Sequence, residues 1–180
     1  MTTLVEKVLA LTEALTTAKI PHAFGGALAL AYCTEDPRGT RDIDVNAFVP
    51  ASQAGPVLAA LPPGIRIPGH TADRIAKDGQ VRLWWDDTPV DLFLDYAPLH
   101  AQAARHARSV PFAGQQIRIL GPVELVLFKA LFDRPKDWVD IATVVAAGAV
   151  DRTAVRRGLV ALMGPGDERL KKWDAHLSVG

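Results

Sequence analysis

The stretch Asp42-Ile43-Asp44-Val45 decides the fold of this chain, together with Phe24-Gly25-Gly26 upstream of it. In an extended strand, residues two apart point to the same face, so Asp42 and Asp44 would present two carboxylates side by side. Neighbouring like charges are costly unless a cation neutralises them. Mg²⁺ suits such a pair, because it takes carboxylate oxygens and leaves positions free for substrate phosphates.

The glycine pair predicts a phosphate contact. Gly26 lets the backbone approach a phosphate closely, and a helix that begins at Ala27 would aim free N–H groups at it. On their own, Gly25 and Gly26 are also consistent with a simple tight turn from strand to helix. With the two aspartates downstream, a phosphate cradle beside a metal site indicates nucleotidyl or phosphoryl transfer.

Composition indicates one folded domain. The chain has 180 residues, of which 49% are hydrophobic and 22% charged, which is enough for a well-buried core and atypical of a disordered protein. The formal net charge is zero, so no global field would attract nucleic acid. RNA binding would have to come from local basic groups, of which Arg152, Arg156 and Arg157 are expected on one helix face. A pure nucleic-acid-binding role is therefore disfavoured.

A single cysteine, Cys33, excludes an internal disulfide and a cysteine-based zinc site, and it fits a reducing compartment. The N-terminal residues show no basic leader followed by an apolar segment, and eighteen apolar residues never run together. We therefore expect a cytoplasmic protein without a membrane partner.

Hydrophobic periodicity and turn residues predict alternating helices and strands. The first helix has apolar residues at helical spacing from Leu4 to Leu15, with a capping box formed by Thr3 and Glu6, and it ends before Pro21. Two strands, 81–85 and 90–95, are expected to form an antiparallel hairpin around a turn at 86–89. The other expected strands lie at 22–24, at 42–49 and in a hairpin around Gly114, and the other helices at 27–33, 52–61, 98–108, 123–133, 136–147, 152–163 and 168–176.

Asp91 is the third candidate carboxylate. In Val90-Asp91-Leu92 it faces away from its apolar neighbours, although Asp95 lies on the same strand face and competes for the role. In two-metal catalysis, carboxylates hold ions that activate the attacking hydroxyl and bridge a triphosphate. Asp42, Asp44 and Asp91 are therefore predicted to be catalytic and to bind metal, with two Mg²⁺ ions, or Mn²⁺, as the cofactor. Two aspartates on a strand alone more often mark a solvated face.

This pattern resembles the nucleotidyltransferase superfamily with the DNA polymerase β-like palm, whose signature is a hydrophobic residue with Gly-Gly or Gly-Ser, a helix, and Asp-x-Asp on a strand. The runs 25–30 and Arg38-x-Thr40-x-Asp42-Ile43-Asp44 are most similar to AbiEii-type nucleotidyltransferases, which include toxins of bacterial toxin–antitoxin pairs. The resemblance implies an α/β (α+β) fold, a mixed, mostly antiparallel sheet packed by helices. Residues 1–120 would form the palm and residues 121–180 a helical C-terminal portion packed on it, as one compact unit.

The likeness continues downstream and covers about residues 20–148. The run 124–130 followed by 134–141 is similar to a family helix with an inward lysine and then Arg/Lys-x-x-Asp-x-x-Asp. It implies that Lys129 is catalytic and holds nucleotide phosphate. Asp137, assigned to the catalytic group, or Asp140, assigned to nucleotide binding, would orient the lysine or a neighbouring base. A lysine in an apolar helix is costly to bury without an anionic partner, although snorkelling to the surface is an alternative. The two aspartates share a helix face near its N-terminus, where stabilising the helix dipole is the alternative role.

The resemblance also assigns Gly25, Gly26, Arg38 and Thr40 to nucleotide binding. An ordinary loop charge is the alternative for Arg38, and support of the strand is the alternative for Thr40.

The implied activity transfers NMP from an NTP to an acceptor hydroxyl and releases pyrophosphate. By resemblance the acceptor is the tRNA 3′ end, and the partner is a neutralising antitoxin protein. Other acceptors remain open, either a protein or a small molecule such as an aminoglycoside antibiotic. Two further alternatives are a catalytically silent domain that binds nucleotide or protein, and a metal-dependent phosphatase or nuclease, which would leave the glycine pair unexplained.

Overall fold

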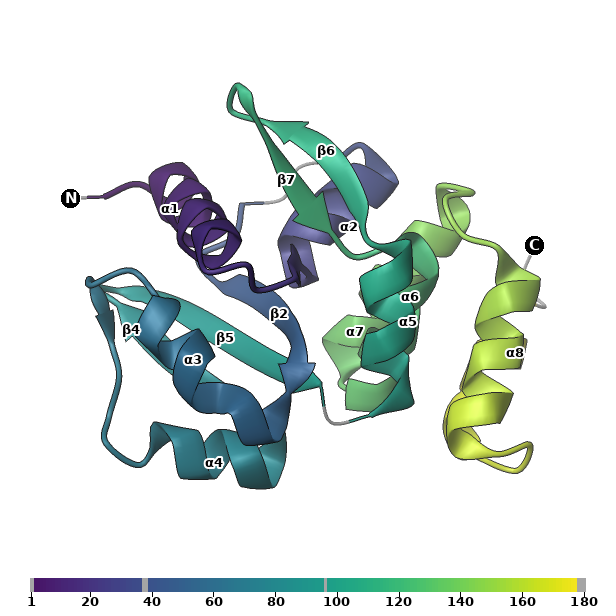
Figure 1. Ribbon diagram of the computed structural model, residues 1–180. Coiled ribbons are helices and arrows are strands. Elements are labelled where there is room, and N and C mark those ends of the chain that lie inside the picture. Colours follow the sequence, from purple (N-terminus) through teal and green to yellow (C-terminus); the bar gives the residue numbers. More distant parts are fainter. Residues whose placement is uncertain (1, 37–38, 96, 178–180) are drawn as a thin grey trace. The chain divides into compact units, whose positions relative to one another are not determined.

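The computed structural model describes residues 2–36, 39–95 and 97–177 (Figure 1). Within these residues the strands form one sheet in the order β3-β4-β5-β2-β1-β7-β6. The pairs β2·β5 and β1·β7 are parallel and the other pairs are antiparallel, so the expected mixed, mostly antiparallel sheet packed by helices is confirmed. The strands are β1 (His22–Phe24), β2 (Ile43–Pro50), β3 (Ile65–Arg66), β4 (Gln80–Trp85), β5 (Thr88–Asp95), β6 (Arg108–Phe112) and β7 (Gln115–Ile119).

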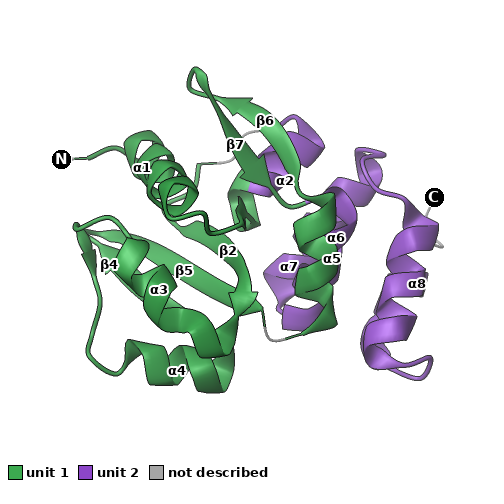
Figure 2. Ribbon diagram, in the orientation of Figure 1, with its two compact units in different colours: residues 1–28, 38–120 green, residues 29–37, 121–180 purple. Residues whose placement is uncertain are grey.

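The chain divides into two compact units (Figure 2). Unit 1 comprises residues 1–28 and 38–120 and contains the sheet, whereas unit 2 comprises residues 29–37 and 121–180 and is helical where it is described. The helices are α1 (Leu4–Thr17), α2 (Gly26–Thr34), the 3₁₀ turn η1 (Ala51–Gln53), α3 (Ala54–Ala60), α4 (Thr71–Asp78), α5 (Pro98–His106), α6 (Pro122–Phe132), α7 (Pro135–Ala146), α8 (Arg152–Met163) and α9 (Glu168–Leu177).

Strand alternation gives β4 and β5 one buried face and one more open face. Val81, Leu83 and Trp85 of β4 are buried, whereas the residues between them are exposed. The same alternation continues in β5, where Val90 and Leu92 are fully buried and their neighbour Asp91 is not. Helix α3 crosses in front of β5 in Figure 1, and its buried residues are Ala54, Val57 and Leu58. Polar residues of β4 and β5 therefore collect on the opposite face.

Helix α1 begins with the predicted capping box. The Thr3 backbone N–H donates to Glu6 Oε2 at 2.7 Å, and the Glu6 N–H donates to Thr3 Oγ1 at 3.2 Å. Val8, Leu11 and Leu15 are buried, as their helical spacing predicts. The apolar stripe of α1 therefore contributes to the core of unit 1.

Lys7 of α1 is buried, with 1% of its surface exposed. Its Nζ donates to the Trp85 carbonyl oxygen and to Thr88 Oγ1, both at 2.9 Å, and lies 3.4 Å from Asp86 Oδ2. These partners surround the turn between β4 and β5. A single lysine thus joins the first helix to the central hairpin.

Two elements have no counterpart in the sequence prediction. Strand β3 has only two residues, too few for an alternating pattern, and α4 is mostly polar, with only Thr71 and Ile75 buried. Gly79 ends α4 in a left-handed conformation, with φ of 69°. The hairpin turn is also shorter than expected, because Thr88 and Pro89 belong to β5 and only two residues, Asp86 and Asp87, connect the strands.

Unit 2 is a set of packed helices. Gly158 of α8 lies against Leu127 of α6 so closely that an added Cβ would be 2.8 Å from a Leu127 methyl carbon. Trp173 of α9 and Val155 of α8 are fully buried. The helices α6, α8 and α9 therefore share an apolar core.

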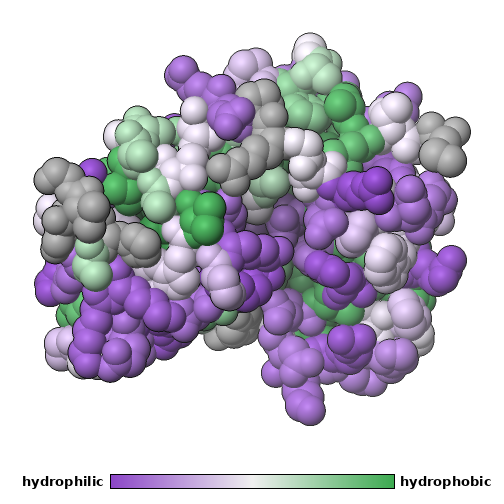
Figure 3. All heavy atoms as spheres, turned by 180° about the vertical axis from the view of Figure 1, so that it is seen from behind, coloured by the Kyte–Doolittle hydropathy of each residue, from purple (hydrophilic) through white to green (hydrophobic). Residues whose placement is uncertain are grey.

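Among the described residues, no helix has the length and apolar content needed to cross a membrane. Seen from behind, hydrophilic side chains cover much of the surface, and the hydrophobic ones lie in separate patches (Figure 3). Single exposed apolar side chains such as Trp84 and Val139 are normal on a protein surface.

Replacement of Lys7 by methionine is expected to lower the free energy of unfolding by about 1–3 kcal/mol, because the Trp85 carbonyl and the Thr88 hydroxyl lose a buried hydrogen-bond donor. Urea denaturation measures this change. The matched control is Lys77→Met in α4, where the side chain is exposed and the change should stay within about 0.5 kcal/mol. Equal effects of the two variants would contradict a structural role for Lys7.

His22 predicts a pH dependence of stability. Its Nδ1–H donates to the Ile20 carbonyl oxygen at 2.9 Å, and burial lowers the pKa of His22 below its ordinary 6.5. The unfolded chain therefore binds a proton more readily, and the free energy of unfolding should fall as the pH drops below 6.5 toward the lower pKa of the folded state. His22→Gln should flatten this decline between pH 7.5 and 5, as measured by urea denaturation. An unchanged slope would contradict the prediction. Burial lowers the pKa of His100 in the same direction, so part of the decline should remain.

Candidate active site

Three aspartates form a carboxylate row on the open face of the sheet, defined as Asp42, Asp44 and Asp91. Asp44 of β2 and Asp91 of β5 are paired residues on adjacent parallel strands. Asp42 lies one residue before β2, two positions from Asp44. Ile43 and Val45 are buried, so the carboxylates face away from the core, as the alternation predicts.

Arg82 of β4 lies opposite Asp91 in the antiparallel pair. Its Nε donates to Asp91 Oδ1 at 2.8 Å and its Nη2 to Asp91 Oδ2 at 2.7 Å, which is a bidentate pair. Nη2 also lies 3.7 Å from Asp42 Oδ2. The hydrogen bonds with Asp91, and the nearby charges of Asp42 and Asp44, raise the pKa of Arg82 above its ordinary value. A permanently charged guanidinium therefore lies beside the carboxylate row, on the β4 side.

Arg82 was not among the residues predicted for the site. The expected turn at 86–89 would pair Trp84 with Asp91, whereas the observed two-residue turn pairs Arg82 with it. The sequence signal that could have indicated Arg82 is its place on the polar side of the first hairpin strand, two residues before Trp84.

Gly25 and Gly26 lie directly beside Asp44. The Gly25 N–H donates to the Asp44 carbonyl oxygen at 2.9 Å. Gly26 has φ of 51°, and a Cβ added there would lie 1.8 Å from Asp44 Oδ2. The first turn of α2 therefore has no room for a side chain at position 26, and the Asp44 carboxylate lies next to the N-terminus of the helix. That terminus carries free N–H groups, which favour anions.

Thr40 supports the start of β2. Its Oγ1 donates to the Asp42 carbonyl oxygen and accepts from the Asp42 N–H, both at 3.2 Å. The side chain thus fixes the backbone that carries Asp42, whereas Arg38 lies outside the described residues. Asp95 pairs with Pro50 at the far end of β5, roughly 13 Å along the strand from Asp91. Asp91 is therefore the β5 residue that meets Asp44.

The carboxylate row suits a divalent cation in its chemistry. Carboxylate oxygens are the ligands that Mg²⁺ prefers, and the absence of a side chain at Gly26 leaves room for the Asp44 carboxylate. In the described part of the chain, however, no three acidic, histidine or cysteine side chains converge as a metal-binding group. Arg82 holds both oxygens of Asp91 instead. Metal ligation by all three aspartates would require the Arg82–Asp91 pair to separate.

Unit 2 contains a lysine cluster, defined as Lys129, Asp137, Asp140 and Arg134. Lys129 Nζ lies 2.7 Å from Asp140 Oδ2 and 3.6 Å from Asp137 Oδ1, so two carboxylates of α7 flank one buried ammonium of α6. Asp137 is completely buried and also accepts a hydrogen bond from Arg134 Nε at 2.6 Å. Lys129 is therefore paired with anions rather than snorkelling to the surface. These ion pairs join α6 to α7, and removal of one partner would leave an uncompensated buried charge.

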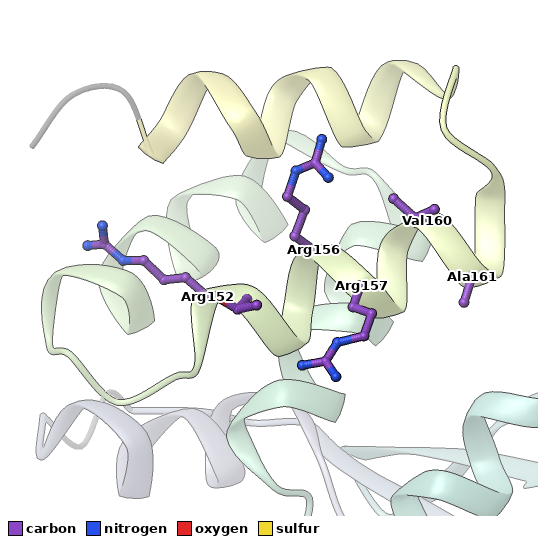
Figure 4. Close-up of a pocket in the computed structure, with 6 residues that line it drawn as sticks. Arg152, Arg156, Arg157, Val160 and Ala161 are labelled. Atoms are coloured by element: carbon purple, nitrogen blue, oxygen red, sulfur yellow. The ribbon is translucent and has the colours of Figure 1, made fainter.

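Helix α8 carries the basic group that was expected on one helix face (Figure 4). Arg156 turns toward α9, where it donates to both carboxylate oxygens of Asp174, at 2.9 and 3.1 Å. Arg157 points away from α9 (Figure 4). The lining of a surface hollow of about 550 Å³ includes Arg152, Arg156 and Arg157. One of the three arginines is therefore held by an acidic partner, and a contact of this basic group with RNA phosphates stays a prediction.

Three solved structures share this fold. The crystal structure of ANT(2″)-Ia in complex with adenylyl-2″-tobramycin has a TM-score of 0.56 and 17% identity, with 97% of each chain covered. The solution structure of the antibiotic-resistance factor ANT(2″)-Ia has a TM-score of 0.54 and 15% identity, over 97% of this chain and 90% of that one. An antigenic nucleotidyltransferase-like protein from Paracoccidioides brasiliensis has a TM-score of 0.52 and 20% identity, with 92% of each chain covered.

No protein-family model and no curated protein matches the chain. The structural matches show that the chain has the fold of nucleotidyltransferases. None of the three matched structures is named as AbiEii-type, so that closer resemblance stays a prediction.

Gly26→Ala is expected to destabilise the protein by at least about 1–2 kcal/mol, because a Cβ disfavours the left-handed backbone and displaces the Asp44 carboxylate. Thermal or urea denaturation measures the change. Gly55→Ala in α3 is the matched control, since nothing lies within 4 Å of the added Cβ and alanine favours a helix. A Gly26→Ala protein as stable as the Gly55→Ala control would refute the contact between Gly26 and Asp44.

Proposed function

We propose that this protein is a Mg²⁺-dependent nucleotidyltransferase that transfers NMP from an NTP to an acceptor hydroxyl and releases pyrophosphate. One observation carries the proposal: Asp44 lies against the glycine turn at the start of α2 and is in register with Asp91 on the next strand. A nucleotidyl transfer site needs carboxylates beside a place where phosphate oxygens can approach backbone N–H groups.

The carboxylate row would hold the metal. Bound Mg²⁺ supplies positive charge that stabilises the triphosphate and the acceptor oxygen in the transition state. Thr40 fixes the backbone of Asp42, and the Gly25 N–H fixes that of Asp44, so these two carboxylates are held in place before substrate arrives. The free N–H groups of the first turn of α2 donate to phosphate oxygens.

The transfer replaces one bond of the α-phosphorus by another and moves one proton. The acceptor oxygen forms a bond to the α-phosphorus while the bond from that phosphorus to pyrophosphate breaks. The proton of the acceptor hydroxyl passes to a carboxylate oxygen of the carboxylate row, which acts as the general base. An acceptor hydroxyl is therefore required.

Lys129 is proposed to contact nucleotide phosphate. Asp140 and Asp137 flank its ammonium group at 2.7 and 3.6 Å and fix its position. In this role Asp137 and Asp140 orient Lys129 and act through it. Nucleotide contact by Arg38 also remains a proposal, whereas the bonds of Thr40 to the Asp42 backbone favour support of the metal site.

Two acceptors are proposed for separate reasons. The resemblance of the Arg38-x-Thr40-x-Asp42-Ile43-Asp44 run to AbiEii-type proteins favours the tRNA 3′ end, with a toxin role and an antitoxin partner. The fold match to ANT(2″)-Ia, solved with adenylyl-2″-tobramycin, favours an aminoglycoside hydroxyl. A zero net charge gives no general attraction to RNA, so the tRNA proposal depends on local contacts.

Labelled NTPs test both acceptors. The protein is incubated with Mg²⁺, each labelled NTP in turn, and either a total tRNA pool or tobramycin. We expect label on one acceptor, and Asp44→Asn should reduce the transfer by about 100-fold or more, the loss typical of removing one preorganised electrostatic group. The control is Asp73→Asn, a change at an exposed residue of α4 that should leave transfer unchanged.

The acceptor that takes label names the substrate class. Label on tRNA supports the toxin-like role, and label on tobramycin supports antibiotic modification. A protein that binds NTP equally well with and without the Asp44→Asn change, and labels no acceptor, would contradict the proposed activity and favour a silent binding domain.

A further inference from the structure

The positively charged side chain of Arg82 contacts the carboxylate row in the way that a bound cation would. Its guanidinium engages both oxygens of Asp91, at 2.8 and 2.7 Å, and approaches Asp42 Oδ2 at 3.7 Å. It belongs to the same row of paired residues as Asp91 and Asp44, on the strand at the other side of Asp91. Unlike a metal, this cation is part of the chain.

The two members of the Arg82–Asp91 pair differ in their exposure to solvent. The Asp91 side chain is only 19% exposed, so its charge is partly removed from water and needs a partner. The Arg82 side chain is 50% exposed, so it has a route into solvent along its flexible stem. A bidentate arginine–carboxylate pair is strong in geometry, yet one exposed partner limits its contribution to stability.

We propose that Arg82 is the counter-ion of the carboxylate row in the metal-free protein, and that a divalent cation has to displace it from Asp91. The inference rests on the proposed function, because it names what controls metal binding at the same site. A guanidinium and a divalent cation repel each other and compete for the same two oxygens. Arg82 is thus a positioning residue, which stabilises the metal-free fold and weakens the binding of metal alone.

Displacement gives the arginine a second role. The released guanidinium stays on β4, beside the carboxylate row, and a planar fork of donors is well suited to phosphate oxygens. When the metal binds to Asp91, the Arg82 guanidinium would therefore donate hydrogen bonds to the triphosphate of an incoming NTP. Arg82 therefore weakens the binding of metal alone and strengthens the binding of metal together with NTP.

Substitution of Arg82 tests this inference without any measurement of catalysis. Arg82→Gln removes the charge and Arg82→Lys retains it without the bidentate fork. The matched control is Arg66→Gln on the neighbouring strand β3, which removes an exposed arginine and the same net charge. Melting temperatures in EDTA and calorimetric titrations with Mn²⁺, alone and with a non-hydrolysable ATP analogue, give the readouts.

Relative to the wild-type protein, Arg82→Gln should melt at a lower temperature in EDTA and bind Mn²⁺ alone about tenfold more tightly, which is a change of about 1.4 kcal/mol. The same variant should bind the Mn²⁺–nucleotide complex more weakly. Arg82→Lys should lie between the wild type and Arg82→Gln, and Arg66→Gln should match the wild type. This opposite change in the two affinities would not arise from a merely structural role.

Two results would overturn the inference, and they are distinguishable. If Asp44→Asn abolishes Mn²⁺ binding but Arg82→Gln binds Mn²⁺ no more tightly than the wild type, the counter-ion role is wrong and the proposed metal site stands. If neither the wild type nor Arg82→Gln binds Mn²⁺, the metal site of the proposed function fails, and the inference fails with it.

Discussion

Three carboxylates on one face of a sheet repel one another, and positive charge beside them offsets this cost. This electrostatic constraint governs unit 1, where Asp44 and Asp91 are paired on parallel strands and Asp42 precedes them. Apolar residues behind these strands form the core, so the aspartates are fixed on the open face by the same alternation that makes the fold stable. Arg82 supplies positive charge beside Asp91, and the carboxylate of Asp44 lies against the glycine turn.

The protein pairs its buried cations with acceptors in both units. Lys7 is held by a carbonyl, a hydroxyl and a nearby carboxylate at the β4–β5 turn, which makes it a structural lysine of unit 1. Lys129 of unit 2 is held by two carboxylates of α7, one of them completely buried. A burial cost explains why each lysine has such partners, but it does not by itself distinguish a catalytic lysine from a structural one. The ion pairs of Lys129 belong to the observed geometry, and its contact with nucleotide remains a proposal.

Much of the fold was predictable from sequence, because its signals are local. The Thr3–Glu6 capping box, the helical spacing in α1 and the strand alternation in β5 all appear in the structure. Strand β3 and helix α4 were missed, since a two-residue strand has no period and a polar helix has little apolar stripe. Arg82 was missed for a different reason: strand register depends on turn length, and a turn of two residues instead of four moves it opposite Asp91. The acceptor is not predictable this way, because acceptor recognition has no local signature comparable to Asp-x-Asp.

The carboxylate row is proposed to hold divalent metal together with nucleotide. A crystal structure with Mn²⁺ and a non-hydrolysable NTP, using the anomalous signal of manganese, tests this proposal. We expect manganese bound to Asp42, Asp44 and Asp91, with the triphosphate at the start of α2 and Arg82 moved from Asp91 onto phosphate oxygens. Nucleotide bound elsewhere, with no manganese at the carboxylate row and Arg82 still paired with Asp91, would contradict it.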